Sequence, residues 1–313
     1  MFGGFFMRRI CLSLTALLAA IPAAQAETLR TEVLYPAASD QAAALRSVQV
    51  EPFGGDAGEG LTIQTEDTLR GINLGRGPWL RVIPAATGSG GEALLRGTAD
   101  TEQRFSDYTE EHERCIKDAQ GKCTAAKEKI TVRCRRRHIE LVVALRLVDR
   151  DGTLLWSDSR PESFEDTHCE DAEGSPRARG SIARELNARV ARRVRLAFAP
   201  RREAEDVRVD EGRKGLSKSD GAVFKRAVRS VKDHRDQAAC ADWAALGQSN
   251  PDHAPTRYNI GLCAETAGED AIAQQQYRRV LLLNPKHALA QAGLGRIADR
   301  SRSRRQIAAH DAD

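Results

Sequence analysis

Two short segments of the chain, 34 residues apart, carry nearly the same sequence. Residues 250–254 read NPDHA and residues 284–288 read NPKHA. A period of about 34 residues is typical of helical-hairpin repeats, in which each unit is too small to bury its own apolar face and stacks on its neighbours. Residues 220–300 are therefore predicted to form an all-α array of helical repeats.

Residues 254–287 resemble the tetratricopeptide repeat. The resemblance is carried by a large–small pair and a turn glycine, then by a small residue, an aromatic residue and a closing proline: Ile260, Gly261, Gly268, Ala273, Tyr277 and Pro285. Ala264 and Val280 depart from the family pattern. The resemblance implies a groove that holds a protein partner, lined by side chains of the first helix: Tyr258, Asn259, Leu262 and Glu265.

The neighbouring units are weaker or incomplete. Residues 220–253 match the repeat mainly at Ala239 and Trp243 in the second helix. A further unit begins with the large–small pair Leu294 and Gly295 and stops after one helix, near Arg300. About three units are normally needed for a stable array, so this array is short.

Six cysteines follow the first 26 residues: Cys115, Cys123, Cys134, Cys169, Cys240 and Cys263. An even number is typical of disulfide-bonded proteins from oxidising compartments. Cys240 and Cys263 fall in adjacent helices of neighbouring units, where a disulfide would stabilise the short array. The alternative for this pair is two buried free thiols.

The other four cysteines are expected to form two disulfides, for which three connectivities are possible. The alternative is a zinc site that also uses His112, His138 and His168. The cysteine spacings of 8, 11 and 35 residues lack the close pair that structural zinc sites show. The sequence therefore favours disulfides and no metal.

The first 26 residues have the three parts of a secretory signal peptide. Arg8 and Arg9 give the positive start, residues 10–21 form an apolar run too short to span a bilayer, and a small-x-small cleavage site ends at Ala26. We expect an exported protein, periplasmic or secreted, without a transmembrane segment. Loss of two arginines lowers the net charge from +4 to +2, which does not indicate nucleic-acid binding.

Residues 45–202 are predicted to form an α+β domain with an antiparallel or mixed sheet, after a patternless leader at residues 27–44. Val48 and Val50 alternate with polar residues, as in a half-buried strand. Residues 139–156 predict a hairpin, because apolar residues at every second position lead into a tight turn.

Local sequence patterns also predict the structure at the end of this domain and on both sides of the repeats. Ser175 and Pro176 predict the start of a helix that ends before Pro200. The charged residues 203–219 are predicted to be a linker, and residues 301–313 a disordered tail.

Upstream of the hairpin, apolar residues take even positions over 130–134 and odd positions over 139–147. This change of phase predicts a bulge near residues 136–138. Arg133, Arg135 and Arg137 would share one face of a strand there. They either protect an exposed edge or bind an anionic partner such as phospholipid head groups.

The first domain resembles the α+β module of the curli-secretion channel protein and of the lipoprotein activators of penicillin-binding proteins. The resemblance rests on residues 48–53, on residues 146–148 before the turn at 151–152, and on the helix that runs to Pro200. It implies a role in envelope assembly. This chain lacks the lipid-attachment motif and has extra cysteines, so neither a pore nor a lipid anchor is carried over.

The sequence shows no nucleophile elbow, phosphate-binding loop or paired-metal motif, so it assigns no catalytic residue and no cofactor. With the predicted groove, this favours a non-catalytic scaffold that docks a protein partner in cell-envelope assembly or maintenance. The alternative is a cell-wall enzyme or regulator that uses the repeats for docking.

Overall fold

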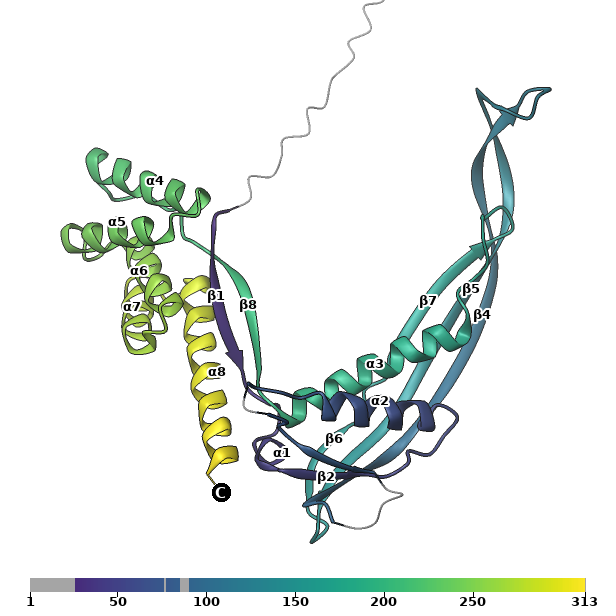
Figure 1. The fold of residues 1–313 in the computed structure, drawn as a ribbon. Coiled ribbons are helices and arrows are strands. Elements are labelled where there is room, and N and C mark those ends of the chain that lie inside the picture. The colour runs from purple at the N-terminus through teal and green to yellow at the C-terminus, as the bar shows by residue number, and fades with distance from the viewer. Residues whose placement is uncertain (1–25, 76, 85–89, 313) are drawn as a thin grey trace, which may run out of the picture.

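The computed structural model describes residues 26–75, 77–84 and 90–312. A sheet-containing domain is followed by a run of five helices, α4 to α8 (Figure 1). The predicted fold class, an α+β domain before an all-α helical array, is confirmed. The predicted signal peptide, apart from its last residue, lies outside the described residues.

The first domain is built on a six-stranded sheet in the order β3-β2-β4-β5-β6, with β7 also pairing with β5. The strands are β2 (Ser47–Val50), β3 (Arg81–Pro84), β4 (Ala93–Lys117), β5 (Cys123–Asp149), β6 (Leu154–Asp158) and β7 (Glu162–Cys169). β2 runs parallel to β3 and β4, and the other pairs are antiparallel, so the sheet is mixed.

Two helices, α2 (Gly58–Arg70) and α3 (Arg179–Phe198), lie on one face of this sheet (Figure 1). The buried side chains of α3 recur at helical spacing, and among them are Ile182, Leu186, Val190 and Val194. They share a core with odd-numbered side chains of β5: Ile139, Leu141, Val143, Leu145 and Leu147. The helix begins at Arg179 rather than at Pro176, so Ser175 does not cap it.

The prediction of a bulge near residues 136–138 was wrong, because β4 and β5 pair in one register from Ala93 to Cys115. The change of phase has a different cause. From Ile139 onward the helices cover the odd-numbered face, whereas Val132 and Cys134 are buried on the other face in a small separate cluster.

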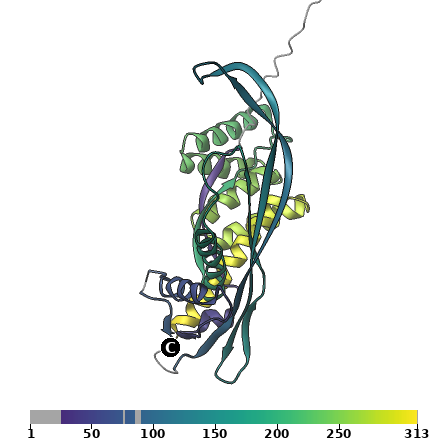
Figure 2. The same cartoon turned by 90° about the vertical axis from the view of Figure 1, so that its right-hand side faces the viewer.

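Beyond the helices, β4 and β5 continue as a long arm that curves away from the core (Figures 1 and 2). We define the arm as residues 101–117 and 123–137. β7 pairs with β5 over Cys134 to Leu141 and supports the base of the arm. The sequence pattern did not predict strands of this length, because charged side chains occupy both faces of the arm.

The second domain consists of α4 (Lys218–Lys232), α5 (Asp236–Ser249), α6 (Ala254–Thr266), α7 (Asp270–Leu283) and α8 (Ala288–Asp311). The repeated segments have the same structural role, because His253 and His287 are the N-caps of α6 and α8. Each imidazole accepts a hydrogen bond from a backbone N–H three residues later, that of Thr256 or Ala290.

Tyr277 of α7 is packed between glycines of two helices. A methyl group on Gly261 of α6 would lie 2.8 Å from a ring carbon of Tyr277, and one on Gly293 of α8 would lie closer still. Gly295, expected in the large–small pair of the last unit, has open space around it. The close helix approach in α8 therefore depends on Gly293 instead.

The predicted leader and the start of the predicted linker contain regular secondary structure. The leader forms β1 (Thr28–Tyr35) and α1 (Asp40–Ala44), and the linker begins with the end of β8 (Arg201–Arg208). β1 and β8 pair with each other as a separate two-stranded sheet, with Thr28 opposite Arg208. Because the partners are so far apart in sequence, no local pattern predicted the pairing.

The predicted disordered tail is instead the second half of α8, which lies beside β1 and reaches α1 (Figure 1). Its buried face is polar. Arg300 donates to the carbonyl oxygen of Glu32, Ser303 to that of Leu34, and Gln306 to that of Ala37. A helix that binds through main-chain oxygens lacks the apolar stripe that sequence analysis detects.

Candidate functional site

The predicted partner groove is filled by the chain itself. Tyr258, Asn259, Leu262 and Glu265 are each at most 1 % exposed. The Asn259 amide donates to the carbonyl oxygen of Asp210 at 2.8 Å and accepts from its N–H at 2.9 Å. The residues after β8 therefore occupy the groove, and the prediction of an open docking groove was wrong.

Glu265 has a structural role in this filled groove. Its carboxylate accepts hydrogen bonds from the Arg296 guanidinium at 2.7 and 2.8 Å and from the Tyr277 hydroxyl at 2.7 Å. Burial and the Glu265 carboxylate raise the pKa of Tyr277. Burial opposes the charge of Arg296, but the same carboxylate outweighs it and raises the pKa of Arg296. All these groups are satisfied within the chain.

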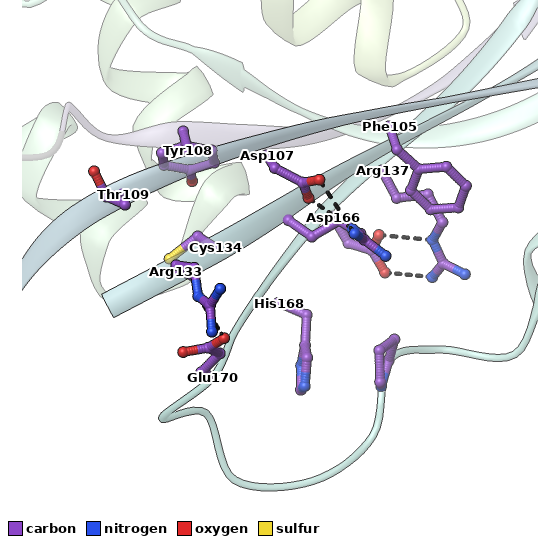
Figure 3. A pocket seen from close by; sticks show the side chains of 12 residues that line it. Phe105, Asp107, Tyr108, Thr109, Arg133, Cys134, Arg137, Asp166, His168 and Glu170 are labelled. Carbon is purple, nitrogen blue, oxygen red and sulfur yellow. Dashed lines mark hydrogen bonds and ion pairs between the residues drawn. The ribbon is translucent and has the colours of Figure 1, made fainter. Parts of the chain in front are cut away.

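A hollow of about 910 Å³ lies at the base of the arm (Figure 3). It is on the odd-numbered face of β5, which shares a core with α3 from Ile139 onward. We call it the arm hollow. Its lining comes from β4, β5, β7 and the loop that leads into α3: Phe105, Asp107, Tyr108, Thr109, Arg133, Cys134, Arg135, Arg137, Asp166, His168, Glu170 and Pro176.

Strand pairing explains why these side chains converge. Arg135 of β5 lies opposite Asp107 of β4 on one side and His168 of β7 on the other. Arg137, two residues along, lies opposite Phe105 and Asp166. Because side chains alternate between the faces of a strand, the odd-numbered residues of β4 and β5 form one polar surface.

The three arginines share one face, and each is paired with a carboxylate. The N···O distances are 2.9 Å for Arg133–Glu170, 2.7 Å for Arg135–Asp107 and 2.6 Å for Arg137–Asp166. The hydrogen bond from Arg135 lowers the pKa of Asp107. The arm hollow is therefore lined by alternating opposite charges rather than by an unpaired basic stripe.

One apolar side chain stands out in the arm hollow. Phe105 is 56 % exposed, and the Arg135 guanidinium carbon lies 5.7 Å from the centre of its ring. This distance is within the range of cation–π contacts. Aromatic residues and arginine are both enriched at protein interfaces. Sequence analysis missed Phe105, because it stands in a charged segment without apolar periodicity.

The six cysteines form three disulfides, so the structure selects one of the three connectivities of the first domain. Cys115–Cys123 closes the tip of the arm, and Cys134–Cys169 joins β5 to β7. Cys240–Cys263 joins α5 to α6, the two helices expected to share it. Three disulfides are typical of an exported protein.

The histidines of the alternative zinc site are separated by the sheet. His112 lies close to Cys134 and Cys169, whereas His168 lines the arm hollow on the other face. His112 contacts Asp171 at 2.6 Å and Glu110 at 3.3 Å, and its hydrogen bond to Asp171 is the main reason that its pKa is raised. Within the part of the chain that the structure describes, no helix combines the length and apolar composition needed to cross a membrane.

No protein-family model and no curated protein matches the chain. Solved structures give partial similarities. The PelC dodecamer from Paraburkholderia phytofirmans has 18 % sequence identity and a TM-score of 0.24, covering 54 % of this chain and 98 % of that one.

Two further structures are a candidate lipoprotein from Caulobacter crescentus and a candidate neuraminyllactose-binding hemagglutinin homolog from Helicobacter pylori. The first has 16 % identity and a TM-score of 0.24, covering 50 % of this chain and 91 % of that one. The second has 13 % identity and a TM-score of 0.28, covering 61 % of this chain and 93 % of that one. At these TM-scores we carry none of their properties over to this chain.

Proposed function

We propose that this protein is an exported, non-catalytic scaffold that binds a protein partner through the arm hollow. The observation that carries the proposal is the exposed ring of Phe105 inside a hollow of about 910 Å³ lined by arginine–carboxylate pairs. The repeat groove does not serve this role, because its four predicted contact residues are buried against other parts of the same chain. The helical domain instead supports the rest of the molecule.

The chemistry of the arm hollow favours recognition over catalysis. Asp107, Asp166 and Glu170 each pair with an arginine, and the hydrogen bond from Arg135 lowers the pKa of Asp107. A general acid or base needs a pKa near the working pH, and the lowered pKa of Asp107 lies further from it. Alternating charges can instead bind the backbone and polar side chains of a partner, while Phe105 supplies the apolar contact.

The compartment and process belong to the same proposal. Three disulfides support an oxidising compartment, and the signal sequence supports the periplasm. The resemblance of residues 48–53 and 146–148 to envelope-assembly modules supports a role in building or maintaining the cell envelope.

Site-specific photocrosslinking in the producing cell tests the binding surface. We expect a benzoylphenylalanine residue at position 105 to give a discrete protein adduct. The matched control is the same probe at Ile63 of α2, which is also 56 % exposed but lies outside the hollow. Once the adduct partner is identified, Phe105→Ala should weaken its binding to the purified chain about tenfold or more, as expected for a central contact.

The opposite pattern would contradict the proposal. Adducts that form equally at positions 63 and 105, or a partner whose affinity is unchanged by both Phe105→Ala and Arg135→Ala, would exclude the arm hollow as the binding surface. Both substitutions replace exposed side chains, so neither is expected to unfold the domain.

A further inference from the structure

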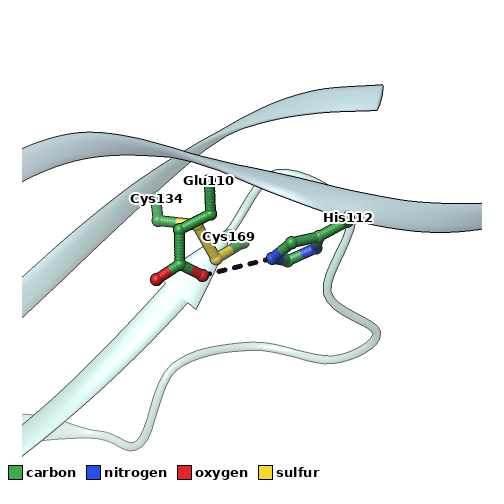
Figure 4. A group of neighbouring side chains, drawn as sticks. All are labelled: Glu110, His112, Cys134 and Cys169. Atoms are coloured by element: carbon green, nitrogen blue, oxygen red, sulfur yellow. Dashed lines mark hydrogen bonds and ion pairs between the residues drawn. A yellow bond between two sulfur atoms is a disulfide. The ribbon is translucent and has the colours of Figure 1, made fainter. Parts of the chain in front are cut away.

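Four metal-ligating side chains meet on the arm beside the arm hollow, and one of them, Cys134, also lines that hollow. Glu110, His112, Cys134 and Cys169 each offer one ligand atom, and these atoms all lie within 4.8 Å of one another (Figure 4). They come from three neighbouring strands, so the sheet itself brings them together. In the structure the two sulfur atoms are joined as a disulfide.

Strand register fixes this arrangement. Cys134 of β5 is directly opposite Cys169 of β7, with 3.9 Å between the Cα atoms. On its other side Cys134 is opposite Tyr108 of β4, and Glu110 and His112 follow at even positions on the same face. Both cysteines are buried, and they form a small core cluster that excludes water from one side of the group.

His112 is oriented as a metal-binding histidine would be. Its Nδ1 contacts the Asp171 carboxylate at 2.6 Å. Its Nε2 faces Glu110 at 3.3 Å, the contact drawn in Figure 4. In metal sites, the ring nitrogen that does not bind the ion usually donates to a carboxylate, which fixes the ring and the tautomer. Asp171 is already placed for this role.

We propose that Glu110, His112, Cys134 and Cys169 form a zinc site when the Cys134–Cys169 disulfide is reduced. A dithiol would supply two electrons and two protons, breaking the S–S bond to give two thiols and becoming a disulfide itself. Binding of Zn²⁺ would then release the two thiol protons and form two Zn–S bonds. The disulfide and the metal site are mutually exclusive, so the oxidation state of this sulfur pair controls metal binding.

The ligand set selects the metal. Thiolate, imidazole and carboxylate are all ligand types that tetrahedral zinc accepts, whereas calcium and magnesium prefer oxygen ligands alone. With zinc–ligand bonds of about 2.0–2.3 Å, tetrahedral ligand atoms lie roughly 3.3–3.8 Å apart. The observed group is compact enough for this after small side-chain rotations. The chain supplies all four ligands, as in a structural zinc site.

Metal titration of the full chain after reduction tests the site. The chain is reduced with a dithiol, which is removed without air, and titrated with Co²⁺ and then Zn²⁺. We expect one equivalent of Co²⁺ to give the absorption bands of a tetrahedral thiolate site, and Zn²⁺ to displace it. The oxidised chain should show neither. Bound Zn²⁺ should also protect Cys134 and Cys169 from alkylation, as measured by mass spectrometry of peptides.

Matched variants separate this site from the other reduced cysteines. His112→Ala should lower zinc affinity at least about tenfold, and Asp171→Asn about 10- to 100-fold, as for residues that orient a ligand. Cys115→Ser combined with Cys123→Ser, at the tip of the arm, should leave binding unchanged. These readouts do not involve Phe105 or Arg135, so they can fail while the proposed function holds.

Three outcomes would overturn the proposal. The first is a reduced chain that keeps its circular dichroism spectrum but binds no metal. The second is binding that survives both His112→Ala and Glu110→Gln, or that is lost in the tip variant. The third is a reduced chain that loses strand structure and does not regain it on addition of Zn²⁺.

Discussion

The hydroxyl of Tyr258 donates a 2.9 Å hydrogen bond to the carbonyl oxygen of Arg208. This contact joins α6, the first helix of the repeat at residues 254–287, to the end of strand β8. It shows that the inner face of the repeats is part of the protein core. Substitutions on this face are therefore expected to change stability before they change binding.

The first prediction concerns Tyr258 itself. Tyr258→Phe removes one hydrogen bond and should lower the free energy of unfolding by about 1 kcal/mol. Tyr258→Ala also empties a fully buried site and should lower it by about 3–5 kcal/mol. Urea unfolding followed by circular dichroism measures both. Leu282→Ala, at a side chain that is 76 % exposed, is the control. A fully stable Tyr258→Ala variant would show that the groove is open in solution.

The second prediction compares a buried ion pair with an exposed one. Glu265→Gln leaves Arg296, whose side chain is 11 % exposed, without a full ion pair to the buried Glu265 position and should lower the free energy of unfolding by about 3–5 kcal/mol. Glu128→Gln breaks the exposed pair with Arg114 and should cost less than about 1 kcal/mol. The same urea titration checks both variants. Equal losses of unfolding free energy in the two variants would mean that water reaches Glu265.

The third prediction concerns the disulfide between α5 and α6. Replacing both Cys240 and Cys263 by alanine should lower the stability of the helical domain by about 3 kcal/mol, because the unfolded chain gains freedom. The comparison is the double alanine variant of Cys115 and Cys123, which frees only the tip of the arm. The temperature of thermal unfolding should fall in the first variant. A similar shift in the second would show that the arm tip unfolds together with the helices.

The fourth prediction is a pH dependence from His253. Burial lowers the pKa of His253 in the folded chain, whereas the unfolded value is about 6.5. Below about pH 6.5 the unfolded state therefore binds more protons than the folded state. The stability that neutral His253 contributes is complete above that pH and is lost as the pH falls toward the folded pKa. His253→Asn keeps an N-cap acceptor and removes the titration. The free energy of unfolding should therefore change less between pH 7.5 and 5 in the variant than in the unsubstituted chain. An equal change in both would contradict this prediction.

The repeats were predictable because their signals are local. Residues 250–254 and 284–288 place His253 and His287 at the starts of two helices, and glycine against Tyr277 marks where helices meet. The β5–β6 hairpin was predictable for a similar reason, since one face is apolar and Gly152 has the positive φ of a tight turn.

The arm and the filled groove were not predictable from local pattern. In the arm, stability comes from cross-strand pairs such as Arg114–Glu128 and Lys127–Glu113, which leave no alternation of apolar residues. The groove is filled through contacts such as Asn259–Asp210, which join distant parts of the chain. In the arm hollow, the sequence pattern singled out Arg133, Arg135 and Arg137, but neither Phe105 nor the carboxylates that pair with the arginines.

Helix α8 makes bonds in both halves of the protein: Arg296 to Glu265 among the repeats, and Arg302 to Asp40 in the first domain. Because α8 is bonded to both domains, it restricts hinge motion between them. A force on the tip of the arm would then rotate the two domains together rather than bend the chain between them.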